Sequence, residues 1–147
     1  MSVGIEVRVV HVDEHLIELR VWASNGTFTG QVDIYANSAV PAETADKLRG
    51  FPSSKDDTRE IELGTFRTDA AGGGAALRFC CNDSAGHVTV VVWLQGDVSR
   101  SGAGVENATF SVPIEAAAVD RFVQQLERMS STVGNGARLE GLHNQLL

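Results

Sequence analysis

The chain has few of the residues that form disulfide frameworks and no long hydrophobic run. Its 147 residues include only two cysteines, Cys80 and Cys81, which are neighbours and therefore cannot form an ordinary structural framework. No apolar stretch approaches the roughly 20 residues that a membrane-spanning helix needs. The first residues lack the basic head and apolar stretch of a secretory signal. We therefore expect a cytoplasmic protein without a membrane partner, whose thiols are reduced.

Basic residues are scarce relative to acidic ones. Twelve Lys and Arg residues stand against 19 Asp and Glu residues, which gives a formal net charge of −7. Nucleic-acid phosphates require a basic surface, so this balance argues against a nucleic-acid partner. It favours a basic protein partner, because long-range attraction speeds the encounter. The alternative interpretation is that mild acidity only keeps the protein soluble.

Apolar and polar residues alternate over much of the chain, which predicts short strands. Three strands before residue 36 are separated by short turns, one of them at Asn25-Gly26, and this predicts an antiparallel meander. The stretch from Val88 to Leu94 is apolar on both faces, so we expect a central strand that is covered on both sides. The predicted strands cover about 3–10, 17–22, 27–34, 59–64, 76–82, 87–95 and 105–112, with 65–68 as a further candidate.

Two segments have helical spacing instead. Pro41 begins a short predicted helix that ends near Arg49, and Pro113 begins a longer one that runs to about Ser131. The apolar stripe of the longer helix suits the second face of the sheet. We predict one α+β domain over 1–134: an antiparallel, meander-like sheet of about six to eight strands, a short helix after the third strand, and a long C-terminal helix packed on the sheet. The tail, 135–147, has leucines at helical spacing and is predicted to be either a short helix or disordered.

The stretch "CCNDSAGHV", which begins at Cys80, gathers more reactive side-chain types than any other. Cys81, Asp83 and His87 have the chemistry of a thiol, an orienting acid and a base. Asn82 to Gly86 are also residues that favour a turn. A cysteine in a strand of an acidic protein lacks the electropositive surroundings that make a thiol reactive. We therefore favour a hairpin turn over a catalytic site and predict no catalytic residue.

Metal and cofactor binding have little support in the sequence. His11 and His15 lie four residues apart in a predicted turn, and the sequence leaves open whether His87 approaches them in space. The local spacing resembles no zinc pattern, and Gly72 to Gly74 lack the Gly-Lys-Ser/Thr ending of a phosphate loop. We predict neither a metal site nor a cofactor.

Acidic residues on outer faces are the candidate partner-binding surface. Several of them come from the middle of the sequence, and the alternative is an ordinary solvated face. The candidates are Asp33, Asp56, Asp57, Glu60, Glu62 and Asp69.

Several stretches resemble small, mostly uncharacterised bacterial proteins of the WapI-type immunity family. The stretches are "TFTGQVDIY", "KLRGFP", "EIELGTF", "LRFCCNDSAGHVTVVVWL" and "FSVPIEAAAVDRFVQQL", and the resemblance runs from about Leu16 to Leu126. The resemblance implies a protein that neutralises a cognate toxin domain by occlusion, without chemistry of its own. It implies no particular binding residue.

Three functions follow from these observations. The first is a non-enzymatic protein-binding module, an immunity protein in the form that the resemblance implies, which acts through an acidic surface. The second is a small-ligand-binding domain with a cleft between the sheet and the long helix. The third is a Cys81/His87 enzyme, which the turn chemistry disfavours.

Overall fold

The structure is a computed structural model that describes residues 2–102 and 104–143. It contains two four-stranded antiparallel sheets, two helices of more than two turns and one single-turn helix. Sheet A has the strand order β3-β2-β1-β8, and sheet B has the order β4-β5-β6-β7. The elements are β1 (Gly4–Val12), β2 (Ile17–Ser24), β3 (Thr29–Ala36), α1 (Val40–Leu48), β4 (Thr58–Gly64), β5 (Gly74–Cys81), β6 (His87–Gln95), α2 (Val98–Ser101), β7 (Asn107–Glu115), α3 (Ala116–Arg128) and β8 (Gly136–Glu140).

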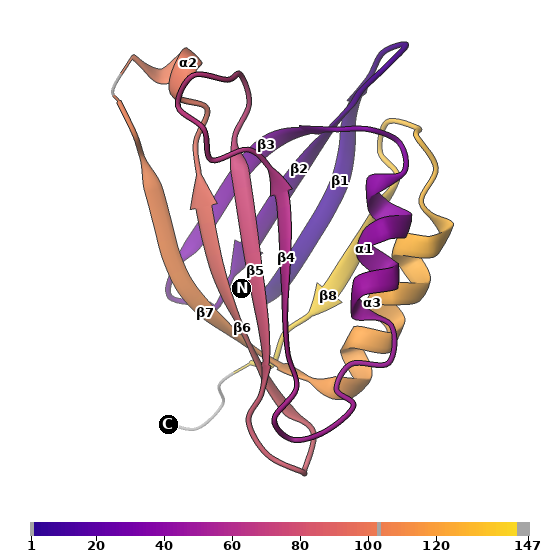
Figure 1. Ribbon diagram of the computed structural model, residues 1–147. Helices are drawn as coiled ribbons and strands as arrows, with labels where there is room; N and C mark the ends of the chain where they lie inside the picture. The colour runs from indigo at the N-terminus through magenta and orange to yellow at the C-terminus, as the bar shows by residue number, and fades with distance from the viewer. Residues whose placement is uncertain (1, 103, 144–147) are drawn as a thin grey trace.

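The predicted α+β class and the antiparallel pairing are confirmed, but the prediction of one sheet is wrong. The strands before α1 form one meander, and β4 to β7 form another, so α1 carries the chain from sheet A to sheet B. The two sheets face each other, with sheet A behind sheet B in Figure 1. Each sheet has an apolar row on its inner face, and facing sheets bury both rows in one core.

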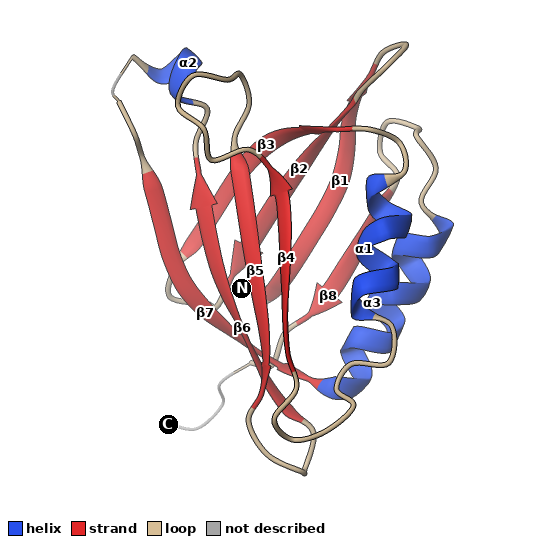
Figure 2. Cartoon of the chain, viewed as in Figure 1, coloured by secondary structure: helices blue, strands red, loops and turns tan. Residues whose placement is uncertain are grey.

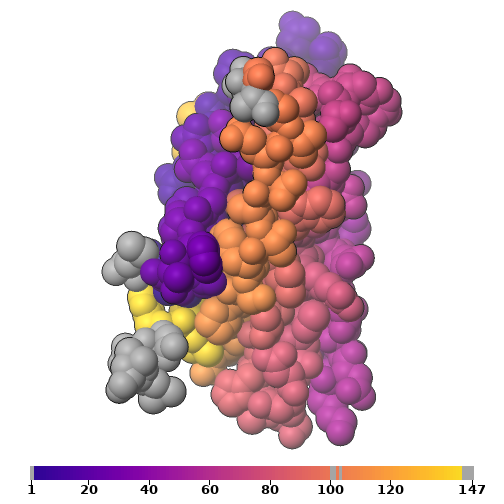
Figure 3. All heavy atoms as spheres, turned by 90° about the vertical axis from the view of Figure 1, so that its left-hand side faces the viewer, coloured from indigo at the N-terminus to yellow at the C-terminus, as the bar shows by residue number. Residues whose placement is uncertain are grey.

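Sheet A lies against sheet B along β3, which contacts β4, β5 and β6, and the turn before β3 contacts β7. Gly30 leaves room for Leu94, whose side chain lies 2.7 Å from where a Cβ on that glycine would be. The rings of Phe28 and Phe110 are 6.5 Å apart, and Asn25 Nδ2 donates to the carbonyl oxygen of Ser111 at 2.9 Å. Figure 3 views this side, with β7 in orange beside the purple strands of sheet A.

The sheets separate at their other edges, and α1 and α3 fill the space between them (Figure 2). Helix α1 packs against α3 and β4, whereas α3 packs mainly against α1 and β8. The stripe of Val119, Phe122 and Leu126 is buried in this wedge. The predicted long helix therefore exists, but it closes an edge and does not cover the outer face of a sheet.

The start of this helix differs from the prediction. Pro113 lies in β7, where it is paired with Thr89, and the helix begins only at Ala116. Proline lacks a backbone N–H, but β7 is an edge strand, and the N–H groups on its free side have no partner strand to bond to. The proline signal for a helix start was therefore misleading, since the residue also suits a sheet edge.

The C-terminal tail forms neither a helix nor a disordered segment over its described part. Gly136 to Glu140 pair with β1, and the side chains of Ala137 and Leu139 are buried in the core. Burial at every second residue is the period of a strand, and the free edge of β1 supplies the hydrogen bonds. Strand β8 therefore belongs to the folded unit that was predicted to end at residue 134. Residues 144–147 of the predicted tail lie outside the described residues.

In the described part of the chain, no helix combines the length and apolarity that crossing a bilayer requires.

Candidate protein-binding surface

The outer face of sheet B carries an exposed tryptophan among acidic residues. Side chains at alternate positions of β4 to β7 point to this face, and one cross-strand row is Glu62, Ala76, Trp93 and Thr109. Trp93 is 42% exposed, which is unusual for a large aromatic residue in the third strand of a four-stranded sheet. In the described residues no helix lies over this face, which looks toward the viewer in Figure 1.

A hollow of about 350 Å³ lies beside Trp93 on this face. Its volume falls at the lower end of the range of about 300 to 1,000 Å³ that is typical of ligand sites. We call it the Trp93 hollow. The residues that line it from the outer face of the sheet are Glu60, Glu62, Ala76, Arg78, Val91, Trp93 and Thr109.

The indole of Trp93 is held in place by the loop after β4. Its ring centroid lies 4.6 Å from that of Phe66, at an interplanar angle of 30°. Gln95, which is buried, donates from Nε2 to the carbonyl oxygen of Phe66 at 3.0 Å. Phe66 itself does not line the hollow, so it supports the indole from outside. An aromatic side chain that is fixed in this way loses little entropy on binding.

The expectation that β6 is covered on both faces is wrong. Val90 and Val92 are buried in the core, but Val91 is half-buried and Trp93 exposed. The apolar residues on the outer face of β6 led to the prediction that the long helix covers them. In the structure this helix lies at the edge between the two sheets. The same residues, without this cover, are the apolar part of the candidate surface.

Three of the predicted acidic residues are paired with arginines. Asp33 on β3 accepts two hydrogen bonds from Arg20, at 2.9 and 3.1 Å. Asp57 accepts from Arg59 at 2.8 Å, and this guanidinium lowers the pKa of the Asp57 carboxyl. Their charges are already compensated, so they contribute little to an acidic surface. Asp69 is paired in the same way with Arg67, which lowers its pKa.

The structure brings together only two of the six predicted partner-binding residues in the hollow. Glu60 and Glu62 lie two positions apart on β4, and both are exposed. Within the described ranges neither of them forms an ion pair, in contrast to Asp33, Asp57 and Asp69. Asp56 is exposed in the loop before β4, outside the lining of the hollow. The sequence-based prediction missed Trp93 because it expected both faces of β6 to be covered, and it did not single out Arg78 or Phe66.

The stretch that begins at Cys80 is the turn between β5 and β6, as predicted. Asp83 shapes it, because its carboxylate accepts from the backbone of Ala85 at 2.8 Å and approaches His87 Nδ1 at 2.7 Å. This contact raises the pKa of His87 and lowers that of Asp83. Gly86 has a φ of +88°, which favours glycine.

The two cysteines of this turn point to opposite faces of sheet B. Cys81 packs against the core, and its thiol donates to the carbonyl oxygen of Asp83 at 3.1 Å. Cys80 is on the outer face, paired across the strands with Thr89. The Asp83 carboxylate contacts the His87 imidazole, whereas the Cys81 thiol donates to a backbone carbonyl. Both contacts stabilise the turn.

His87 lies at the opposite end of the molecule from His11 and His15. His11 and His15 belong to the β1–β2 hairpin, whose tip is at the upper right in Figure 1, whereas the β5–β6 turn with His87 is at the bottom. Over residues 2–102 and 104–143, no group of three or more His, Cys, Asp or Glu side chains could hold a metal ion.

The space between the sheets and the helices is filled by side chains. The cavity bounded by Val7, Leu63 and Phe122 measures about 10 Å³. This volume is about that of one water-sized probe, so it cannot hold a small-molecule ligand. The predicted cleft between sheet and long helix is therefore closed in this structure.

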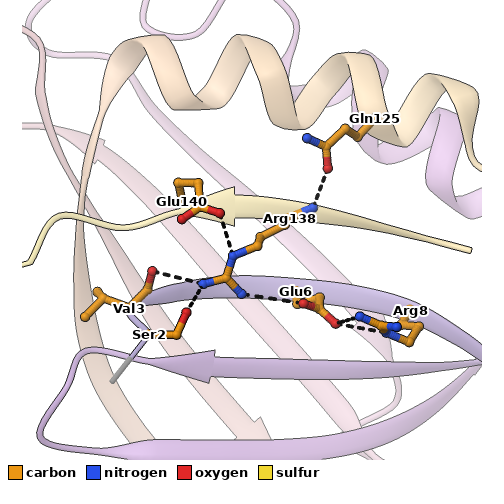
Figure 4. A network of polar contacts seen from close by, with 7 residues as sticks. All are labelled: Ser2, Val3, Glu6, Arg8, Gln125, Arg138 and Glu140. Atoms are coloured by element: carbon orange, nitrogen blue, oxygen red, sulfur yellow. Dashed lines mark hydrogen bonds and ion pairs between the residues drawn. The ribbon is translucent and has the colours of Figure 1, made fainter. Parts of the chain in front are cut away.

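The outer face of sheet A carries the other tryptophan, but there the charged groups compensate each other. Arg138 on β8 lies over the ring of Trp22 at 5.4 Å and contacts Glu6 at 3.5 Å and Glu140 at 2.6 Å. Figure 4 shows the contacts of Arg138 with Glu6 and Glu140, together with the neighbouring pair of Glu6 and Arg8. The indole of Trp22 is thus occupied by a guanidinium of the same chain.

Comparison of the chain with protein-family models, with curated proteins and with solved structures finds no significant match.

Proposed function

We propose that the chain is a non-enzymatic protein-binding module that contacts a basic protein through the outer face of sheet B. The observation that carries this proposal is the exposed indole of Trp93, fixed against Phe66 and bordered by Glu60 and Glu62. Tryptophan is enriched among the residues that contribute most to binding, and a polar rim around it is typical of interfaces. An apolar centre on an uncovered face is a recognised sign of an interaction site.

The charge of the molecule supports a basic partner. The net charge is −7, and the two carboxylates of the hollow form no ion pair among the described residues. A basic surface that approached this face would pair with Glu60 and Glu62 without first breaking an internal pair. The predicted surface is therefore narrowed to these two residues, because Asp33, Asp57 and Asp69 already contact arginines.

The resemblance to WapI-type immunity proteins supports one particular form of this function. In that form the partner is a toxin domain, and the protein neutralises it by covering the toxin's functional surface. Such occlusion needs a rigid face and no catalytic group, and the β-sheet outer face is rigid because both neighbours of each central strand are hydrogen-bonded.

The test uses the proteins encoded by the genes on either side of this one. Each is produced separately and titrated into this chain in a calorimeter at two salt concentrations. We expect a basic neighbour to bind, and the variant Glu62→Lys to weaken binding at least tenfold at low salt. The matched control is Glu14→Lys, which reverses a charge on a side chain that is 90% exposed in the β1–β2 turn.

The outcomes of this titration test the binding face and the immunity form of the proposal separately. Binding that is weakened by Glu62→Lys and unchanged by Glu14→Lys supports it. Binding that both variants weaken equally shows only a general effect of net charge and contradicts a site on sheet B. If neither neighbouring protein binds, the immunity form of the proposal is refuted.

A further inference from the structure

The Trp93 hollow exists because a small residue separates an indole from a carboxylate. In the cross-strand row, Ala76 on β5 lies between Glu62 on β4 and Trp93 on β6. Neighbouring strands are about 4.8 Å apart, so the flanking residues are separated by about 10 Å at the backbone. The single methyl group of Ala76 leaves the space between them open. The floor is apolar, formed by Ala76 and Val91, and one wall is aromatic.

The charges around the hollow leave a negative excess. Glu60 and Glu62 supply two carboxylates, and Arg78 supplies one guanidinium. Arg78 lies opposite Glu60 across the strands, whereas Glu62 lies opposite Ala76 and so has an uncharged neighbour. A ligand group that enters between Glu62 and Trp93 therefore meets a carboxylate on one side and an indole on the other.

Sheet A shows which group such a combination accepts. There, Glu6 lies between Trp22 and Arg138 in a cross-strand row, and the guanidinium of Arg138 reaches both the indole and the carboxylate. Figure 4 shows how this guanidinium is directed toward Glu6 and Glu140. Sheet B repeats the indole and the carboxylates, and among the described residues no arginine lies over the ring of Trp93 as Arg138 lies over Trp22.

We propose that the Trp93 hollow binds an arginine side chain of the protein partner. The guanidinium lies against the indole and donates to the carboxylate of Glu62, while its methylene groups cover Ala76 and Val91. A planar guanidinium stacks on an aromatic ring and donates two parallel hydrogen bonds, which an ammonium group cannot do. This inference rests on the proposed protein-binding function and names the side chain that the surface recognises.

The test measures whether a short arginine peptide reaches Trp93. The ¹⁵N-labelled protein is titrated with acetyl-Gly-Arg-Gly-amide, and the indole Nε1–H signals are followed by NMR. The chain has two tryptophans, so Trp22 serves as an internal control. We expect a saturable shift of the Trp93 signal, with a dissociation constant on the order of 1 mM, and no saturable shift of the Trp22 signal. The matched peptide with citrulline, which has the same shape without the charge, should bind at least fivefold more weakly.

Two variants test the geometry. Ala76→Leu fills the hollow from its outer-face floor and should abolish the shift, while the circular dichroism spectrum stays that of the native fold. Glu62→Gln should weaken binding at least threefold, and Glu14→Gln, in the distant β1–β2 turn, should leave it unchanged. Equal binding of the arginine and citrulline peptides, or an unchanged shift in the folded Ala76→Leu variant, would overturn the proposal.

The results separate this inference from the proposed function. If the peptide fails to shift Trp93 but Glu62→Lys still weakens binding of the protein partner, the face is an interface and the arginine pocket is refuted. If the peptide binds but no neighbouring protein does, the pocket stands and the immunity form fails.

Discussion

Substitution of Leu139 by alanine tests whether the C-terminal strand is part of the core. Leu139 is fully buried on β8 and lies opposite Ile5 on β1. Removal of a buried leucine side chain costs about 2 to 5 kcal/mol, from lost transfer free energy and the cavity that remains. With a urea dependence of about 2 kcal/mol per molar, a loss of 3 kcal/mol lowers the unfolding midpoint by about 1.5 M.

The assay is urea unfolding followed by tryptophan fluorescence. The control is Leu16→Ala, since Leu16 is 42% exposed at the β1–β2 turn and its loss should cost less than about 1 kcal/mol. If Leu139→Ala costs no more than Leu16→Ala, residues 136–140 do not pack on β1. The tail would then be a short helix or disordered, the two forms that were predicted from the sequence.

Three further predictions concern particular side chains. Arg138→Met should lower the free energy of unfolding by about 1 to 2 kcal/mol, because Arg138 is partly buried and contacts two carboxylates and an indole; no change in the urea midpoint would contradict this role. In an NMR pH titration His87 should have a pKa above 6.5, and Asp83→Asn should lower it; an unchanged midpoint in the variant would refute the contact. The pair stabilises the fold fully between the ordinary pKa values of the two groups, 3.8 and 6.5, and this effect is lost as pH rises through the native pKa of His87 or falls through that of Asp83. With a thiol reagent, Cys80→Ser should remove the faster-reacting thiol, because Cys80 lies on the outer face and Cys81 against the core; faster reaction of Cys81 would contradict this placement.

Much of the fold could be predicted because the signals are local. Alternation located β1 to β7 but not β8, and the Asn-Gly and Asp-to-Gly patterns located two turns, since turn chemistry depends on neighbouring residues. The division into two sheets depends on where the chain goes after β3, which α1 decides by its packing against α3. Those contacts join residues far apart in the sequence, and one sequence alone does not show them.

The errors have a common physical origin. Pro113 was assigned to a helix and the tail to a helix or disorder, because propensity does not reveal which strand edges are free. β7 is an edge strand that tolerates a proline, and the edge of β1 is completed by a segment with only five strand residues.

The candidate site was only partly visible in the sequence. Glu60 and Glu62 were identified by their charge, but Trp93 was expected to be covered. Exposure of an aromatic residue depends on whether another element lies over it, and here the helix that was expected to do so closes the edge between the sheets. Residues that are opposite across strands, such as Ala76 and Trp93, are likewise brought together only by register.

The most direct test of the central claim is the affinity of the Trp93→Ala variant for the basic partner. A tryptophan at the centre of an interface typically contributes at least about 2 kcal/mol, which corresponds to a loss of about 30-fold in affinity. The control is Phe28→Ala, which removes an aromatic side chain that is 61% exposed in the turn between β2 and β3. The account predicts a loss of at least 30-fold for Trp93→Ala and less than threefold for Phe28→Ala. Equal affinities of the folded Trp93→Ala variant and the unaltered protein would contradict it.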